Sequence, residues 1–163
     1  MTAEAGLAAL WFAAALAALQ LALAGLAVRR KDAALLAAVR PVALVQGVMA
    51  ALAMAALITV FCVSDMSVAL VAENSHSAKP MLYKFAGAWG NHEGSMLLWV
   101  TILGLAGGAV ALLERRLDER TLTATLGGQA AIALGFYAFL LFASNPFARL
   151  DPAPADGQGL NPL

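Results

Sequence analysis

The chain has 163 residues, of which 62% are hydrophobic and 12% are charged, and its mean hydropathy is +0.81. A soluble domain usually carries about 25% charged residues, so this composition excludes an ordinary soluble protein and predicts one that lies in a lipid bilayer. Ten basic residues balance ten acidic ones, which excludes a basic surface for nucleic acid.

Four long neutral stretches follow one another along the chain. They cover residues 7–28, 42–63, 95–113 and 122–143. Each is close to the roughly 20 residues that a helix needs to cross about 30 Å of hydrocarbon, and a helix satisfies the backbone polar groups of such a segment in lipid. We therefore predict an all-α polytopic membrane protein in which four transmembrane helices form one bundle, over residues 1–143.

The four stretches contain few polar side chains, and Gln20, Gln46 and Gln129 are the most polar of them. No Asp, Glu, Lys, Arg or His lies well inside any stretch, which argues against an ion or proton pathway through these helices alone. Gly104 and Gly108 have the G-x-x-x-G spacing that lets helix backbones approach closely. We interpret these glycines as packing positions in a crowded bundle.

The segments outside these stretches differ in character. Residues 64–80 are polar at both ends and carry a short apolar patch. Within residues 81–91, apolar side chains recur at the first, fourth and eighth positions counted from Leu82, which is one face of a helix, so we predict a short interfacial helix there. Residues 144–163 contain four of the six prolines and are therefore predicted to be extended rather than helical.

Basic residues gather in the first and third connections of the predicted bundle. They are Arg29, Arg30, Lys31, Arg40, Arg115, Arg116 and Arg120. Because basic loops stay in the cytoplasm, we predict that both ends of the chain lie outside. The first apolar stretch is longer than the roughly 7–15 residues of a signal peptide, and its positive charges follow it, so we expect an uncleaved first helix.

The segment from Trp89 to Ser95 concentrates polar groups where an aqueous loop enters the third stretch. Asn91 is a predicted N-cap, and the carboxylate of Glu93 then faces the positive end of the helix. The alternative is a direct role for His92, as an axial ligand, in a proton path or in contact with a bound partner. Both interpretations remain open. The candidate functional residues are Trp89, Asn91, His92, Glu93 and Ser95.

The same region carries a resemblance to a known family. Residues 81–100 read MLYKFAGAWGNHEGSMLLWV, which strongly resembles the N-terminal region of CcmF, the large subunit of the bacterial system for cytochrome c maturation, and of its nitrite-reductase counterpart NrfE. Further stretches agree in the same order, namely RPVAL at 40–44, VALVAENS at 68–75, SNPF at 144–147, and residues 152–157 and 160–163.

The resemblance implies a cytochrome c haem lyase at the periplasmic face of the bacterial inner membrane, so that both ends of the chain would be periplasmic. Such an enzyme receives haem from the haem chaperone CcmE and joins it to the thiols of an apocytochrome c. It works with CcmH and CcmI, and it binds its own haem b in the membrane.

The chain also departs from the family pattern. Family members are several times longer, and their tryptophan-rich loop and haem-ligating histidines lie beyond the position that matches Leu163. We therefore expect no catalytic residue, metal ligand or haem ligand in these 163 residues, which should not be active alone. Residues 144–163 are expected to begin a longer outer loop, in a chain that is either naturally split or truncated. The alternative function is a membrane subunit of a transporter or respiratory complex.

Overall fold

The computed structural model describes residues 1–159 and contains six helices in that range. The long helices are α1 (Thr2–Arg30), α2 (Ala33–Cys62), α5 (His92–Leu113) and α6 (Glu119–Phe142). The short ones are α3 (Ala69–Asn74) and α4 (Met81–Gly87). All four long helices have the length and apolar composition that crossing a membrane requires, which confirms the prediction of an all-α membrane protein with four spans.

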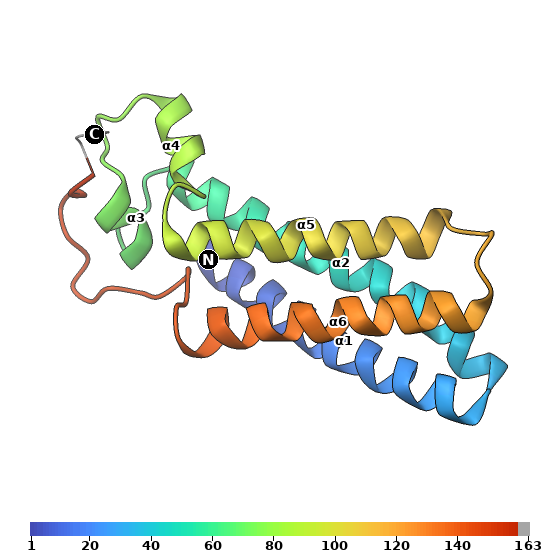
Figure 1. Cartoon of the computed structure of the whole chain (residues 1–163). Coiled ribbons are helices and arrows are strands. Elements are labelled where there is room, and N and C mark those ends of the chain that lie inside the picture. Colours follow the sequence, from blue (N-terminus) through green and yellow to red (C-terminus); the bar gives the residue numbers. More distant parts are fainter. Residues whose placement is uncertain (160–163) are drawn as a thin grey trace.

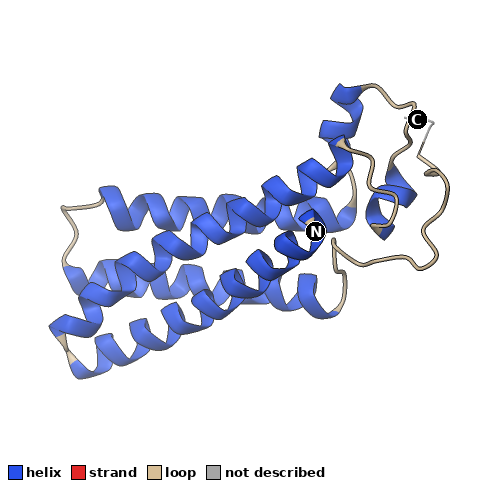
Figure 2. Cartoon of the chain, turned by 180° about the vertical axis from the view of Figure 1, so that it is seen from behind, coloured by secondary structure: helices blue, strands red, loops and turns tan. Residues whose placement is uncertain are grey.

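The long helices form one elongated bundle (Figure 1). Helix α1 packs against α2 and α6, and α2 also packs against α5, whereas the contact between α5 and α6 is less extensive. The short connections α1–α2 and α5–α6 lie together at one end of the bundle, which we call the basic end (Figure 1). Helices α3 and α4 and the C-terminal segment gather at the other end (Figure 2); we call residues 63–91 and 144–159 the cap.

The helices extend beyond the apolar stretches that predicted them. Helix α2 begins at Ala33 rather than near residue 42, because Asp32 caps it by accepting from the backbone N–H of Ala34 at 2.9 Å. Arg40, assigned from the sequence to a connection, therefore lies inside α2. The helix can begin before the apolar stretch because helical backbone requires a cap and helix-forming residues, which need not be apolar. Arg40 is tolerated near the membrane edge because its long side chain can reach polar surroundings.

Small residues fill the interface between the helices. Fully buried alanines include Ala13, Ala17, Ala43, Ala50, Ala53, Ala130 and Ala133. At the crossing of α2 and α5, a Cβ atom added to Gly47 would lie 2.5 Å from the carbonyl oxygen of Gly104, so the two backbones touch there. The interpretation of the glycines as packing positions is borne out at Gly104, which faces Gly47 and the side chain of Gln46.

The cap differs in detail from the sequence prediction. The apolar patch near residue 70 forms helix α3, which the sequence analysis did not predict, and its residues Leu70, Val71 and Ala72 are buried. The short helix predicted over residues 81–91 ends at Gly87, and turns connect it to α5. Residues 144–159 contain no helix, while the last part of the segment predicted to be extended, residues 160–163, lies outside the described residues.

Candidate functional site

Asn91 shapes the turn through which the chain leaves the cap and enters α5. Its Oδ1 accepts a hydrogen bond from the backbone N–H of Gly94 at 2.7 Å, and its Nδ2 donates to the carbonyl oxygen of Gly87 at 2.8 Å. One amide side chain thus satisfies a free donor at the start of α5 and a free acceptor at the end of α4. The predicted N-cap at Asn91 is confirmed.

Gly94 fits this turn because it lacks a side chain. It is buried, and a Cβ atom added to it would overlap the carbonyl oxygen of Ala88. By contrast, a Cβ atom on the neighbouring Gly90 would meet its nearest atom, the oxygen of Ala86, at an ordinary distance of 3.5 Å. No sequence pattern predicts this role of Gly94, since only the tertiary structure brings the Ala88 carbonyl against the first turn of α5.

The side chains of His92 and Glu93 point to different partners. The exposed His92 ring packs edge-to-face against Phe139 of α6, with ring centroids 5.3 Å apart. Glu93 accepts a hydrogen bond from the Ser144 hydroxyl at 2.8 Å, which ties the start of α5 to the segment that follows α6. No hydrogen bond or ion pair within residues 1–159 joins the two side chains, as expected for adjacent residues of a helix.

The two remaining candidates make contacts at the same turn between α4 and α5. Ser95 donates its hydroxyl to the carbonyl oxygen of His92 at 2.9 Å. The Trp89 indole packs edge-to-face on Phe85 of α4, with ring centroids 4.8 Å apart. The five candidates therefore lie in one turn, which we call the rim (Trp89–Ser95). Asn91 and Ser95 bond to nearby backbone groups, and Glu93 bonds to Ser144 beyond α6. No hydrogen bond within residues 1–159 engages the ring nitrogens of His92, which packs on Phe139 instead.

The segment after α6 is held on the cap by backbone hydrogen bonds. The N–H of Ala69 donates to the oxygen of Ala148 at 2.9 Å, and the N–H of Leu150 donates to the oxygen of Ser67 at 2.9 Å. Further along, Gln158 donates to the oxygen of Ala72 at 2.7 Å. Backbone hydrogen bonds thus join the segment after α6 to the loop before α3 and to α3 itself, outside the bundle.

Charged groups reinforce that pairing at two points. Arg149 forms ion pairs with Glu4 and Asp65. Asp156 accepts from the hydroxyl and the backbone N–H of Ser77, and these hydrogen bonds lower the pKa of Asp156 to about 2.

His76 belongs to the same network. Its Nδ1 accepts from the N–H of Ala78 at 3.1 Å, and its Nε2 lies 3.5 Å from a carboxylate oxygen of Asp156. Among residues 1–159 there is no group of three or more His, Cys, Asp or Glu side chains placed to hold a metal ion.

A second polar cluster lies inside the bundle, and its members were not predicted as functional residues from the sequence. Gln20 donates to the oxygen of Leu126 and to Oε1 of Gln129, each at 2.8 Å. Gln46 donates to the Tyr137 hydroxyl, and both side chains are fully buried. These bonds link α1 and α2 to α6 by neutral groups, which is the way membrane helices use buried polar residues for packing.

Several known proteins are similar to this chain over most or all of its length. No protein-family model matches the chain. It is 52% identical to the cytochrome c-type biogenesis protein Ccl1 of Rhodobacter capsulatus over 128 residues, which are 78% of this chain and 20% of that protein. It is 47% identical to CycK of Bradyrhizobium diazoefficiens and 44% identical to CcmF of Pseudomonas aeruginosa, in each case over 100% of this chain and 25% of the relative.

A solved structure described as cytochrome c haem lyase CcmF has the same arrangement of helices. The TM-score is 0.85 and the identity 27%, over 90% of this chain and 25% of that structure. The chain thus spans between 20% and 25% of the length of these relatives, in an N-terminal portion of them.

Proposed function

Because this chain belongs to the CcmF family of cytochrome c-type biogenesis proteins and matches an N-terminal portion of its members, we propose that it frames the haem-handling part of a cytochrome c haem lyase. In the proposed reaction, the whole protein takes haem from the chaperone CcmE and attaches it to the thiols of apocytochrome c, with CcmH and CcmI as partners and a haem b in its membrane part. The four spans supply a rigid support for that chemistry rather than its reacting groups.

The distribution of charge supports an orientation in which the basic end faces the cytoplasm and the cap faces the periplasm across the inner membrane. Seven of the ten Lys and Arg residues lie at the basic end. Six of the ten acidic residues lie at the opposite end, in the cap or in the adjoining helix turns. Positive residues are retained on the cytoplasmic side during insertion, and haem attachment in this system takes place on the opposite side.

The rim is the part of this chain that we propose to contact haem or a partner. Capping and close packing account for Asn91 and Gly94, and a hydrogen bond to Ser144 accounts for Glu93. His92 is exposed beside Phe139 and has an aromatic neighbour instead of a hydrogen-bonding one. The observation that carries the proposal is this exposed histidine, held at the joint between cap and bundle in the segment that most resembles the family.

The neutral interior of the bundle favours this support role over the alternative of a transporter or respiratory subunit. In the middle of the described spans, the buried polar side chains are Gln20, Gln46, Thr101 and Tyr137. Ion and proton pathways in membranes rely on ionisable residues that face the bundle interior, whereas these four side chains are neutral and bond between helices.

A chimera tests the proposed function directly. This chain would replace the matched N-terminal quarter of Pseudomonas aeruginosa CcmF in a strain that lacks its own copy, and holocytochrome c would be measured by haem staining. We expect the chimera to restore cytochrome c. A chimera that accumulates in the membrane at the normal level but makes no holocytochrome c contradicts the proposal.

Substitution of His92 in the same chimera separates the two interpretations of the rim. If His92 contacts haem or a partner, His92→Ala should reduce holocytochrome c at an unchanged protein level, while Ser95→Ala, which removes only a local hydrogen bond, should not. If both variants make as much holocytochrome c as the parent chimera, the rim residues act only in helix capping and packing.

A further inference from the structure

A crevice opens on the lipid-facing side of the bundle at its basic end, between α2 and α5. Its volume is about 400 Å³. It is lined by Arg40, Pro41, Leu44, Ala111, Leu112 and Arg115. The walls are therefore apolar, and the two polar side chains that line the crevice are both guanidinium groups.

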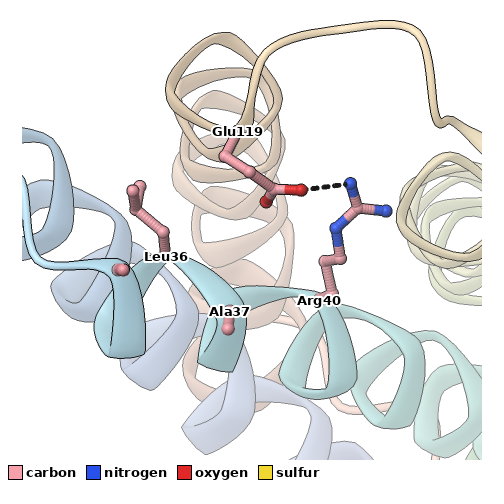
Figure 3. A pocket seen from close by; sticks show the side chains of 5 residues that line it. Leu36, Ala37, Arg40 and Glu119 are labelled. Carbon is pink, nitrogen blue, oxygen red and sulfur yellow. Dashed lines mark hydrogen bonds and ion pairs between the residues drawn. The ribbon is translucent and has the colours of Figure 1, made fainter.

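The Arg40 guanidinium is fixed in place by the protein. Its Nη1 donates to the carbonyl oxygens of Ala111 and Glu114, each at 3.0 Å, and its Nη2 pairs with Glu119 at 2.8 Å. Figure 3 shows this ion pair, with Glu119 reaching across from α6 to Arg40 on α2. These bonds use three of the five N–H donors of Arg40, so its Nε and one Nη2 donor stay available.

Arg115 supplies a second positive charge. It lies one residue beyond the C-cap of α5 and is exposed, and within residues 1–159 no hydrogen bond or ion pair holds its side chain. One guanidinium is thus preorganised and the other is free to close on a ligand. Arginine presents planar donors that match the oxygens of a phosphate.

The crevice on the other side of Arg40 shows the contrast. It has a volume of about 240 Å³ and is lined by Ala33, Leu36, Ala37, Arg40 and Glu119 (Figure 3). There the carboxylate of Glu119 faces the same guanidinium and opposes a phosphate. The α2–α5 crevice has two arginines and no acidic side chain in its lining, so of these two crevices only this one presents an excess of positive side chains to a ligand.

We propose that the α2–α5 crevice binds the phosphate headgroup of an anionic phospholipid. Arg40 and Arg115 hold the phosphate, and an acyl chain lies along Leu44 and Leu112, which are 38% and 58% exposed on the surface that faces lipid. The combination of two guanidinium groups with an apolar wall fits a lipid better than a free phosphate, and basic pockets between transmembrane helices are where anionic headgroups bind. This inference concerns the basic end and does not depend on the haem-lyase proposal.

Native mass spectrometry of the full chain in detergent tests the site, with phosphatidylglycerol and phosphatidylcholine offered at equal concentration. We expect one phosphatidylglycerol to bind in preference to phosphatidylcholine. Arg115→Gln should weaken the binding of phosphatidylglycerol about fivefold, the effect of one basic side chain near a membrane surface. Arg116→Gln is the matched control: it removes the same charge from the neighbouring position, which does not line the crevice, and it should leave the affinity within about twofold.

Several results overturn the proposal. Equal weakening by Arg115→Gln and Arg116→Gln would mean that the lipid responds to the charge of the whole surface. Equal binding of phosphatidylcholine would mean that the apolar wall alone holds lipid. Displacement of phosphatidylglycerol by millimolar inorganic phosphate would assign the site to the free anion instead. Arg40 is left unchanged because it donates to two carbonyl oxygens of another helix, and its substitution could disturb the fold. The Arg115 side chain has no such structural bonds within residues 1–159, so its substitution should not impair folding.

Discussion

The interior of the bundle and the cap are both crossed by polar contacts between distant parts of the chain, but the contacts are chemically different. Inside the bundle they are neutral, as between Gln46 and Tyr137, and they sit beside glycines and alanines where backbones touch. In the cap they are backbone hydrogen bonds between irregular segments, with charged pairs such as Arg149 and Asp65 at the edges.

The difference follows from the solvent that each region meets. Lipid offers no partner for an open backbone group, so the spans satisfy their backbone within each helix and use side chains to connect helices. The cap lies in water or at the interface, where irregular backbone is tolerated and exposed charges are screened. We therefore expect the stability of the interior to respond mainly to changes in side-chain size, and the stability of the cap to changes in charge and pH.

Gly94, at the joint between the two regions, should give the largest effect. In Gly94→Ala the new Cβ overlaps the Ala88 carbonyl, and the hydrogen bonds of Asn91 to Gly87 and Gly94 hold this turn on both sides. We expect a loss of about 3 kcal/mol or more in the free energy of unfolding, measured by titration with SDS in mixed micelles. Gly90→Ala, whose Cβ has ordinary space, is the control. Similar losses in both variants would show that helix flexibility, rather than this close approach, sets the stability.

Gly47 tests the sensitivity of the interior to shape. In Gly47→Ala the added methyl group would lie 2.5 Å from the Gly104 oxygen and would push α2 and α5 apart. We expect a loss of about 1–3 kcal/mol in the same titration. Gly128→Ala is matched in chemistry, but apart from its own helix backbone and chain neighbours no atom lies within 4 Å of the new Cβ, so it should be neutral or slightly stabilising. A neutral Gly47→Ala would contradict the tight crossing.

The bond between Gln46 and Tyr137 should contribute less than the packing around it. A double-mutant cycle with Gln46→Leu and Tyr137→Phe isolates their interaction. We expect a coupling of about 0.6 kcal/mol, and no more than about 1.7 kcal/mol, as for other hydrogen bonds between membrane helices. Additive single effects would indicate that the two side chains are buried for shape alone.

Asp156 should give the smallest effect, confined to the cap. Its folded pKa of about 2 lies below the ordinary value of 3.8, so its stabilising contribution is present above about pH 4 and is lost as the pH falls through the folded pKa. We expect hydrogen exchange of the Ala69 and Gln158 amides to accelerate between pH 4 and pH 2, after correction for the intrinsic pH dependence of exchange. In Asp156→Asn this acceleration should be weaker. An identical profile in the variant would assign the pH dependence to other carboxylates.

Much of the fold could be predicted from the order of residues. Hydropathy alone requires four helices, because segments of this length and polarity have no other way to satisfy their backbone in lipid. The cap of α5 was also predictable, since Asn91 is a strong N-cap type directly before an apolar stretch. Helix α3 was missed because its six residues are too few to show a period, and its burial depends on the segment that follows α6.

What the sequence determined by itself was the number of spans, the type of the protein and the position of the rim, because these depend on local composition and on the solvent. The tertiary structure alone decided which groups meet: Gly94 with Ala88, Glu93 with Ser144, Gln46 with Tyr137, and Arg40 with the end of α5. The two partners of each pair are between 6 and 91 residues apart in the sequence. Only the packing of the helices brings them together in space, so no local sequence pattern predicts these contacts.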